Sequence, residues 1–345
     1  MRTAKKALIG LVLAILLVGL SLPMAAEACG CGMVLPHEGS VDVTQEQAII
    51  RWDGQTEDIV MALQAQGNAK EAAWIMPVPG PAQVKLGDPG MFDFLQEFTK
   101  PREEYRISLL LDILALGGAP AATPAAAPVT LLARREIGLF DVSILAATDA
   151  TALTGWLKAN GYTFPNAAAK VLQHYVDQGW YYVAARISPG KTSEVHGELD
   201  PLWITFRSNQ LVYPMRTTAL ARRPEAVILY ILADHRMDVP ELHTSFAGWI
   251  SPSDLPAEEN PSQQVVDRKY FLTKLQTVIQ VPETWAEQDY FASYIPDDEY
   301  RDVEVVYQQV SCFALCGALL ALLLVVWFAV LVRRSRKGRA QKGAS

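Results

Sequence analysis

The stretch EAAWIMPVPGP, Glu71–Pro81, decides how this chain is interpreted. Its apolar first half, centred on Trp74, is typical of a strand packed into a core, but Pro77, Pro79 and Pro81 then follow at every second position. In a strand, the N–H groups of residues two apart point to the same neighbour, so these prolines remove the donors along one side. We therefore expect Trp74 to be buried and the segment to be an edge strand or to pass into polyproline II. A proline-rich docking segment for a partner is the alternative.

The segments around this stretch predict a domain rich in antiparallel sheet. AIIRWDG ends at the turn signal Asp53-Gly54, and DIVMALQAQGN ends at Gly67-Asn68. The short connections favour antiparallel pairing of consecutive strands. AVILYILA is apolar on both faces and is expected to be a central strand. The other candidate strands after residue 179 are WYYVAARIS, PLWITFRS, LVYPMRTT, TSFAGWI and Tyr270–Val281.

Two or three helices are expected among these strands. DATALTGWLKANG and PNAAAKVLQHYVDQG each contain a capping residue, an apolar face at helical spacing and a glycine at the end, and MFDFLQEF fits a short amphipathic helix. The predicted fold class is therefore α+β, an antiparallel-sheet-rich domain with inserted helices. The Ala/Pro-rich run at 117–128 fits neither regular structure and is expected to be a flexible insert.

The first 28 residues have the features of a secretory signal peptide. Basic residues at positions 2, 5 and 6 precede an apolar run, and Ala26-Glu27-Ala28 supplies small residues at −3 and −1 before Cys29. An uncleaved signal anchor and a lipid-anchored Cys29 are the alternatives.

A second apolar segment, Ser311–Val332, holds 22 residues without a charge. At about 1.5 Å per residue, a helix of this length spans the roughly 30 Å hydrocarbon layer. Six Lys and Arg residues follow within 333–345, whereas acidic residues precede the segment. The positive-inside rule then puts the tail in the cytoplasm. We expect a single-pass, cell-surface protein of the cell membrane with an extracytoplasmic N-terminal domain.

The expected organisation is a signal peptide (1–28), an extracytoplasmic α+β domain (29–281), an acidic stalk (282–310), a transmembrane helix (311–332) and a basic cytoplasmic tail (333–345). Between Cys29 and Val332 the chain holds 21 basic and 36 acidic residues, a net charge of about −15. Such a surface repels nucleic acid. The expected partners are the lipid bilayer, through 311–332, and an unidentified protein or cell-envelope ligand.

Several motifs together resemble an uncharacterised bacterial family, the domain of unknown function 2330. They are ACGCG after the signal peptide, EAAWIMPVPGP, LTGWLKANGY, and LDPLWITF followed by LVYPMRTTAL. The resemblance covers roughly Cys29 to Asp234. In this chain Cys29 and Cys31 are more closely spaced than the family pattern implies, so the resemblance leaves their pairing open. It implies no catalytic residue.

The sequence predicts no catalytic, cofactor-binding or metal-ligating residue. None of the five histidines forms a metal pair at helical spacing, and no nucleophile or phosphate-binding motif occurs. Cys29 and Cys31 are the candidate disulfide, because thiols in an oxidising compartment do not stay free. We expect a binding or assembly module without a cofactor. An extracytoplasmic enzyme is the alternative, with thiol/disulfide redox through Cys29 and Cys31 as its one visible route.

Overall fold

The computed structural model describes residues 33–110, 140–146, 150–159, 166–187, 194–220, 223–256, 260–280 and 289–311, together with Trp327. The chain divides into two compact units. One comprises residues 1–100 and 135–301, and the other residues 101–134 and 302–345.

The larger unit is built on a nine-stranded sheet with the order β18-β14-β15-β12-β2-β3-β10-β5, in which β9 also pairs with β3. Its pairs are antiparallel except β2 and β12, which are parallel. The strands are β2 (Val41–Trp52), β3 (Thr56–Gly67), β5 (Gln83–Leu86), β9 (Gly197–Glu198), β10 (Leu202–Arg207), β12 (Glu225–Ala233), β14 (His243–Ile250), β15 (Tyr270–Ile279) and β18 (Tyr300–Arg301).

A second, four-stranded antiparallel sheet has the order β1-β4-β8-β7. Its strands are β1 (Met33–Pro36), β4 (Ala72–Val78), β7 (Phe140–Ala146) and β8 (Tyr181–Ile187). The remaining elements of this unit are the helices α2 (Gly90–Phe98), α3 (Ala150–Ala159) and α4 (Asn166–Asp177), the 3₁₀ turns η1 (Arg216–Leu220), η2 (Pro252–Asp254) and η3 (Pro261–Gln264), and the short pairs β11 (Val212–Tyr213) with β16 (Tyr290–Phe291) and β13 (Met237–Asp238) with β17 (Ser293–Tyr294).

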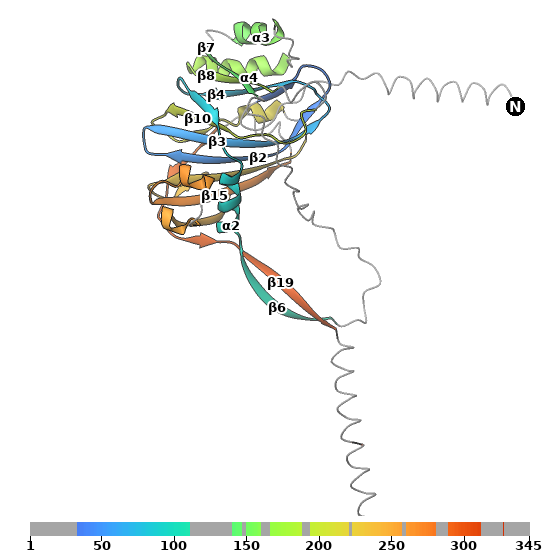
Figure 1. The fold of residues 1–345 in the computed structure, drawn as a ribbon, viewed down its shortest axis with the longest axis vertical. Coiled ribbons are helices and arrows are strands. Elements are labelled where there is room, and N and C mark those ends of the chain that lie inside the picture. The colour runs from blue at the N-terminus through green and yellow to red at the C-terminus, as the bar shows by residue number, and fades with distance from the viewer. Residues whose placement is uncertain are drawn as a thin grey trace, which may run out of the picture. The chain divides into compact units, whose positions relative to one another are not determined.

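The two sheets and the helices form layers with a core between each pair (Figure 1). The main core lies between the sheets and joins alternate residues of β4, such as Trp74 and Met76, to alternate residues of β2, β3 and β12. The other face of β4, with Ile75, packs under α3 and α4 through Leu157 and Tyr175. The outer face of the large sheet is covered by α2 and the η3 region. The predicted antiparallel-sheet-rich α+β domain is confirmed.

β4, the strand within the stretch Glu71–Pro81, is buried on both faces. Trp74 is 2% exposed, as predicted. β4 is not an edge over 72–75, however, because β1 pairs with those residues on one side and β8 on the other. The described part of β1 ends at Met33 opposite Ile75, so beyond that pair β4 has a described partner only in β8. Pro77 lies opposite Tyr182 of β8, and Pro79 follows after the strand ends.

β4 also departs from the expected order of strands. β2 and β3 form the expected antiparallel hairpin, but β4 leaves β3 and joins the other sheet. AVILYILA is central, as its two apolar faces predict, because β12 lies between β15 and β2. The connection to β2 is parallel, which short-range pairing rules do not predict.

The segment expected as an acidic stalk, 282–310, is structured where it is described. Residues 289–301 supply β16, β17 and β18 to the larger unit, and Tyr290 is 3% exposed. The buried Asp289 carboxylate accepts hydrogen bonds from the Tyr175 hydroxyl (2.6 Å) and from the backbone N–H groups of Met215 (2.9 Å) and Arg216 (3.2 Å). It thereby joins α4 to η1. The acidic residues and prolines suggested a stalk, but the described part of the segment contains aromatic residues in strand pairs, namely Tyr290, Phe291, Tyr294 and Tyr300.

The smaller unit contains a two-stranded parallel ribbon, β6 (Arg102–Leu110) with β19 (Val303–Ser311). The expected insert at 117–128 and the expected signal peptide lie outside the described residues, as does the predicted membrane segment apart from Ser311 and Trp327. Among the residues that the structure does describe, no helix is both long and apolar enough to cross a bilayer.

Truncation of Trp74 tests the central position of the opening stretch. Trp74→Ala should lower the free energy of unfolding by about 3–5 kcal/mol, because it leaves a large cavity between the sheets. Urea unfolding followed by far-UV circular dichroism measures this loss. Trp249→Ala is the matched control, since that ring is 38% exposed, and it should cost clearly less. Equal losses in the two variants would contradict the buried position of Trp74.

Glu57 predicts a pH-dependent loss of stability. Burial raises the pKa of this carboxyl well above 4.5, although its Oε2 accepts a hydrogen bond from the Val212 N–H (3.2 Å). Above pH 4.5 the unfolded chain has lost this proton while the folded protein still holds it, so stability falls as the pH rises. One such proton is worth about 1.4 kcal/mol per pH unit. Between pH 5 and 8 the free energy of unfolding of the wild type should therefore fall relative to that of Glu57→Gln. Urea unfolding at several pH values measures this difference. If the free energies of unfolding of the two proteins change with pH in the same way, ionisation of Glu57 does not destabilise the fold.

Candidate functional site

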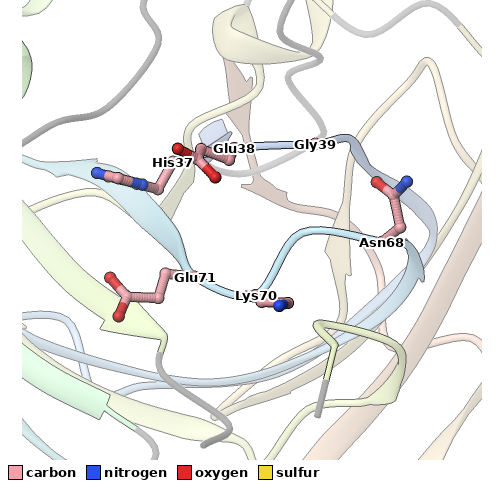
Figure 2. A pocket seen from close by; sticks show the side chains of 6 residues that line it. All are labelled: His37, Glu38, Gly39, Asn68, Lys70 and Glu71. Atoms are coloured by element: carbon pink, nitrogen blue, oxygen red, sulfur yellow. The ribbon is translucent and has the colours of Figure 1, made fainter. Parts of the chain in front are cut away.

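A polar hollow opens on the larger unit, where three chain connections pass from one sheet to the other. Residues 37–40 link β1 to β2, residues 68–71 link β3 to β4, and the segment before β9 returns from β8. The volume of the hollow is about 410 Å³. Figure 2 shows its lining, which consists of His37, Glu38, Gly39, Asn68, Lys70 and Glu71.

The connections around the hollow are joined by backbone hydrogen bonds. The Ser40 carbonyl accepts from the N–H groups of Asn68 (3.0 Å) and Ala69 (3.1 Å), and the His37 N–H donates to the Glu71 carbonyl (2.9 Å). The Asn68 side-chain oxygen accepts from the Ser40 N–H (2.8 Å). The third connection is attached through the Val195 N–H, which donates to the Ala69 carbonyl (2.7 Å). The hollow is therefore held open between fixed backbone segments.

Glycine is required where these connections meet. Gly39 has φ +85°, and a Cβ there would lie 2.6 Å from the Asn68 side-chain oxygen. A Cβ on Gly67 would lie 2.1 Å from the Ser40 carbonyl oxygen. Both residues therefore serve the close approach of the two connections as well as the turn itself.

The lining carries charges of both signs. Glu71 forms an ion pair with Arg186 of β8 (2.7 Å), whereas Glu38 and Lys70 are exposed to solvent. The arrangement offers a cation, carboxylates and an imidazole to a polar ligand. None of the described residues that line the hollow carries a hydroxyl or a thiol. Across the described ranges, no group of three or more His, Cys, Asp or Glu side chains is placed to hold a metal ion.

A second polar centre, on the other face of the large sheet, has the character of a structural network. Asp58 accepts hydrogen bonds from the Trp203 indole N–H (2.9 Å), the Thr205 hydroxyl (2.5 Å) and the Arg51 guanidinium (2.6 Å). Burial opposes ionisation of Asp58, but these three donors outweigh it and lower its pKa. Arg51 also bonds Asp267 (3.0 Å). Because Asp58 is already satisfied by protein groups, this centre joins strands rather than presenting ligands.

Trp74 and the three prolines singled out from the sequence are not among the residues that line this hollow. Cys29 and Cys31, the candidate disulfide, lie outside the described residues. Trp74 and Pro77 are buried in β4, and Pro79 and Pro81 lie in the following connection, with Pro81 exposed. Trp74 and Pro77 therefore belong to the packed part of the strand.

Sequence reasoning missed His37, Glu38, Lys70 and Glu71. The only local signals were the glycine at position 39 and the Gly67-Asn68 turn, about 30 positions apart. Nothing in either turn indicates that both lie where the chain crosses between sheets. The site forms where the connection from β1 to β2 passes next to the connection from β3 to β4.

These layers and the hollow at their junction define a two-sheet α+β domain. The chain belongs to the family described as "Uncharacterized protein conserved in bacteria (DUF2330)", whose model matches residues 25–292. This confirms the resemblance seen in the sequence and extends it beyond Asp234.

Among curated proteins, no match is found. Two solved structures of the baculovirus P35 protein are similar in part. The first has 12% identity and a TM-score of 0.40, covering 74% of this chain and 97% of that one. The second is a mutated form after caspase cleavage, with 10% identity and a TM-score of 0.32, covering 72% and 99%. At these TM-scores the likeness carries no inference about this chain.

Proposed function

We propose that this chain is a single-pass membrane protein whose α+β domain lies outside the cytoplasm and binds a polar ligand or cell-envelope partner at the hollow. The anchor is supported by the uncharged Ser311–Val332 segment and the six basic residues after it. The secretory character of residues 1–28 supports export of the domain.

The observation that carries the binding role is the fixed geometry of the hollow. Its two lining connections are joined by hydrogen bonds at Ser40 and at the pair His37–Glu71, so that a ligand would not have to order them. When a binding site is already ordered, less of the interaction free energy is lost in ordering it, and the ligand binds more tightly. Glu38 and Lys70, exposed to solvent, supply charges of both signs for a polar partner.

The anchor and its orientation are tested by protease accessibility. Protease added to intact spheroplasts should degrade the domain between Cys29 and Gln309 and spare a peptide tag placed after Ser345, because only the tail is expected in the cytoplasm. Immunoblots against both regions measure the outcome. A tag that is degraded while the membrane stays intact would reverse the orientation, and a domain that is protected would contradict its exposure outside the cell.

The hollow is tested by photo-crosslinking in intact cells. A photoreactive amino acid at position 38 should give a discrete adduct, whereas the same group at the exposed position Gln96 on α2 should not. Lys70→Glu should reduce the adduct several-fold because it removes the exposed cation of the lining. Lys158→Glu, a charge reversal on the exposed surface of α3, is the matched control and should leave the adduct unchanged. Equal adducts from positions 38 and 96 would contradict a binding role for the hollow.

A further inference from the structure

The ribbon of the smaller unit pairs two distant segments in parallel and in register. Arg102 lies opposite Val303 at its start, and Leu110 lies opposite Ser311 at its end. The start is closed by a hydrogen bond from the Arg102 N–H to the Asp302 carbonyl (2.8 Å). Because parallel strands in register advance together, every position of β6 has a companion at the same height on β19.

The charge of the ribbon changes along its length. The charged residues stand in its first half, at Arg102, Glu103, Glu104, Arg106 and Glu304. From position 107 of β6 and position 305 of β19 onward, neither strand contains a charged residue. The uncharged end is also the end at which Ser311 begins the 22-residue uncharged segment.

The backbone sets a limit to how deeply such a ribbon enters a membrane. In the described part of the chain, β6 pairs only with β19, so each strand has one outer edge without a partner strand. The outward N–H and C=O groups of these edges need hydrogen bonds from water or lipid headgroups, which the hydrocarbon layer does not supply. The ribbon is thus suited to the headgroup layer and excluded from the hydrocarbon.

We propose that the uncharged end of this ribbon lies in the headgroup layer of the bilayer, so that β6 gives the chain a second lipid contact beside its C-terminal anchor. The inference rests on the proposed function, because it takes Ser311 as the start of a membrane-spanning segment. The register then places Leu110 at the depth of Ser311. A headgroup layer of about 5–8 Å accommodates about two residues at roughly 3.3 Å each, which corresponds to Leu109 and Leu110 on β6.

Two tyrosines stand on the approach to this end. Tyr105 is 60% exposed and Tyr307 is 61% exposed, and they occupy neighbouring register positions, opposite Val306 and Arg106 respectively. Tyrosine is enriched at membrane–water interfaces because its ring is apolar and its hydroxyl is polar. Because successive side chains of a strand point to opposite faces, the two rings project from opposite faces of the ribbon, and a tilt of the ribbon would bring only one of them toward the headgroups.

The test measures depth along the ribbon in the full chain, reconstituted in phosphatidylcholine–phosphatidylglycerol nanodiscs. An environment-sensitive fluorescent amino acid is placed singly at positions 104, 110, 311 and 320. A lipid carrying a nitroxide near its headgroup quenches probes in the bilayer interface, and iodide quenches probes in water. Positions 110 and 311 should be quenched equally by the lipid, several-fold more than position 104, which should respond to iodide. Position 320 reports the anchor.

The possible results separate the ribbon from the anchor. If position 110 responds to iodide as strongly as position 104, while 311 responds to the lipid and 320 is shielded from iodide, the ribbon contact is overturned and the anchor stands. If position 320 also responds to iodide, the membrane anchor fails and the ribbon contact fails with it. Leu110→Asp, read from a probe at position 109, should move that position toward iodide access, whereas Glu104→Gln should not.

Discussion

Both faces of the nine-stranded sheet are buried, and this constraint explains the layers around it. Its central strands β2, β3 and β12 place apolar side chains on alternate faces, so each face requires its own cover. The four-stranded sheet covers one face, and α2 with the η3 region covers the other. The small sheet is itself apolar on both faces and therefore needs α3 and α4. Asp289 then joins α4 to η1 within this arrangement.

Features specified by neighbouring residues could be predicted from the sequence. The Asp53-Gly54 turn is one example, since Gly54 has φ +91° and the Asp53 carboxylate accepts the Gln55 and Thr56 N–H groups. Pairings between distant segments could not be predicted from the sequence, because no local pattern identifies the partner strand. The parallel pairs β2–β12 and β6–β19 belong to this kind, as does the transfer of β4 to the second sheet. The hollow escaped prediction for the same reason, since each of its connections is an ordinary turn when taken alone.

The polar groups of the domain differ in whether the protein already satisfies them. Asp58 is surrounded by three donors and holds strands together. Glu57, the adjacent residue on β3, is buried in the opposite face with a single hydrogen bond from Val212, and its Oε1 has no partner among the described residues. Glu38 and Lys70 instead line a fixed hollow. The buried polar groups thus join strands or make the stability depend on pH, whereas the charges of Glu38 and Lys70 stay exposed to solvent.

The ribbon also constrains the order in which the chain acquires its structure. The described partner of β6 is a strand about 200 positions further along, so this pairing waits until β19 has emerged. Such long-range pairing forms slowly, because a large loop must close before any contact rewards it. Until then the edge of β6 that pairs with β19 is open to other extended segments nearby. A chain that ends before Val303 would lack β19, so it would keep this edge open and be more prone to aggregate.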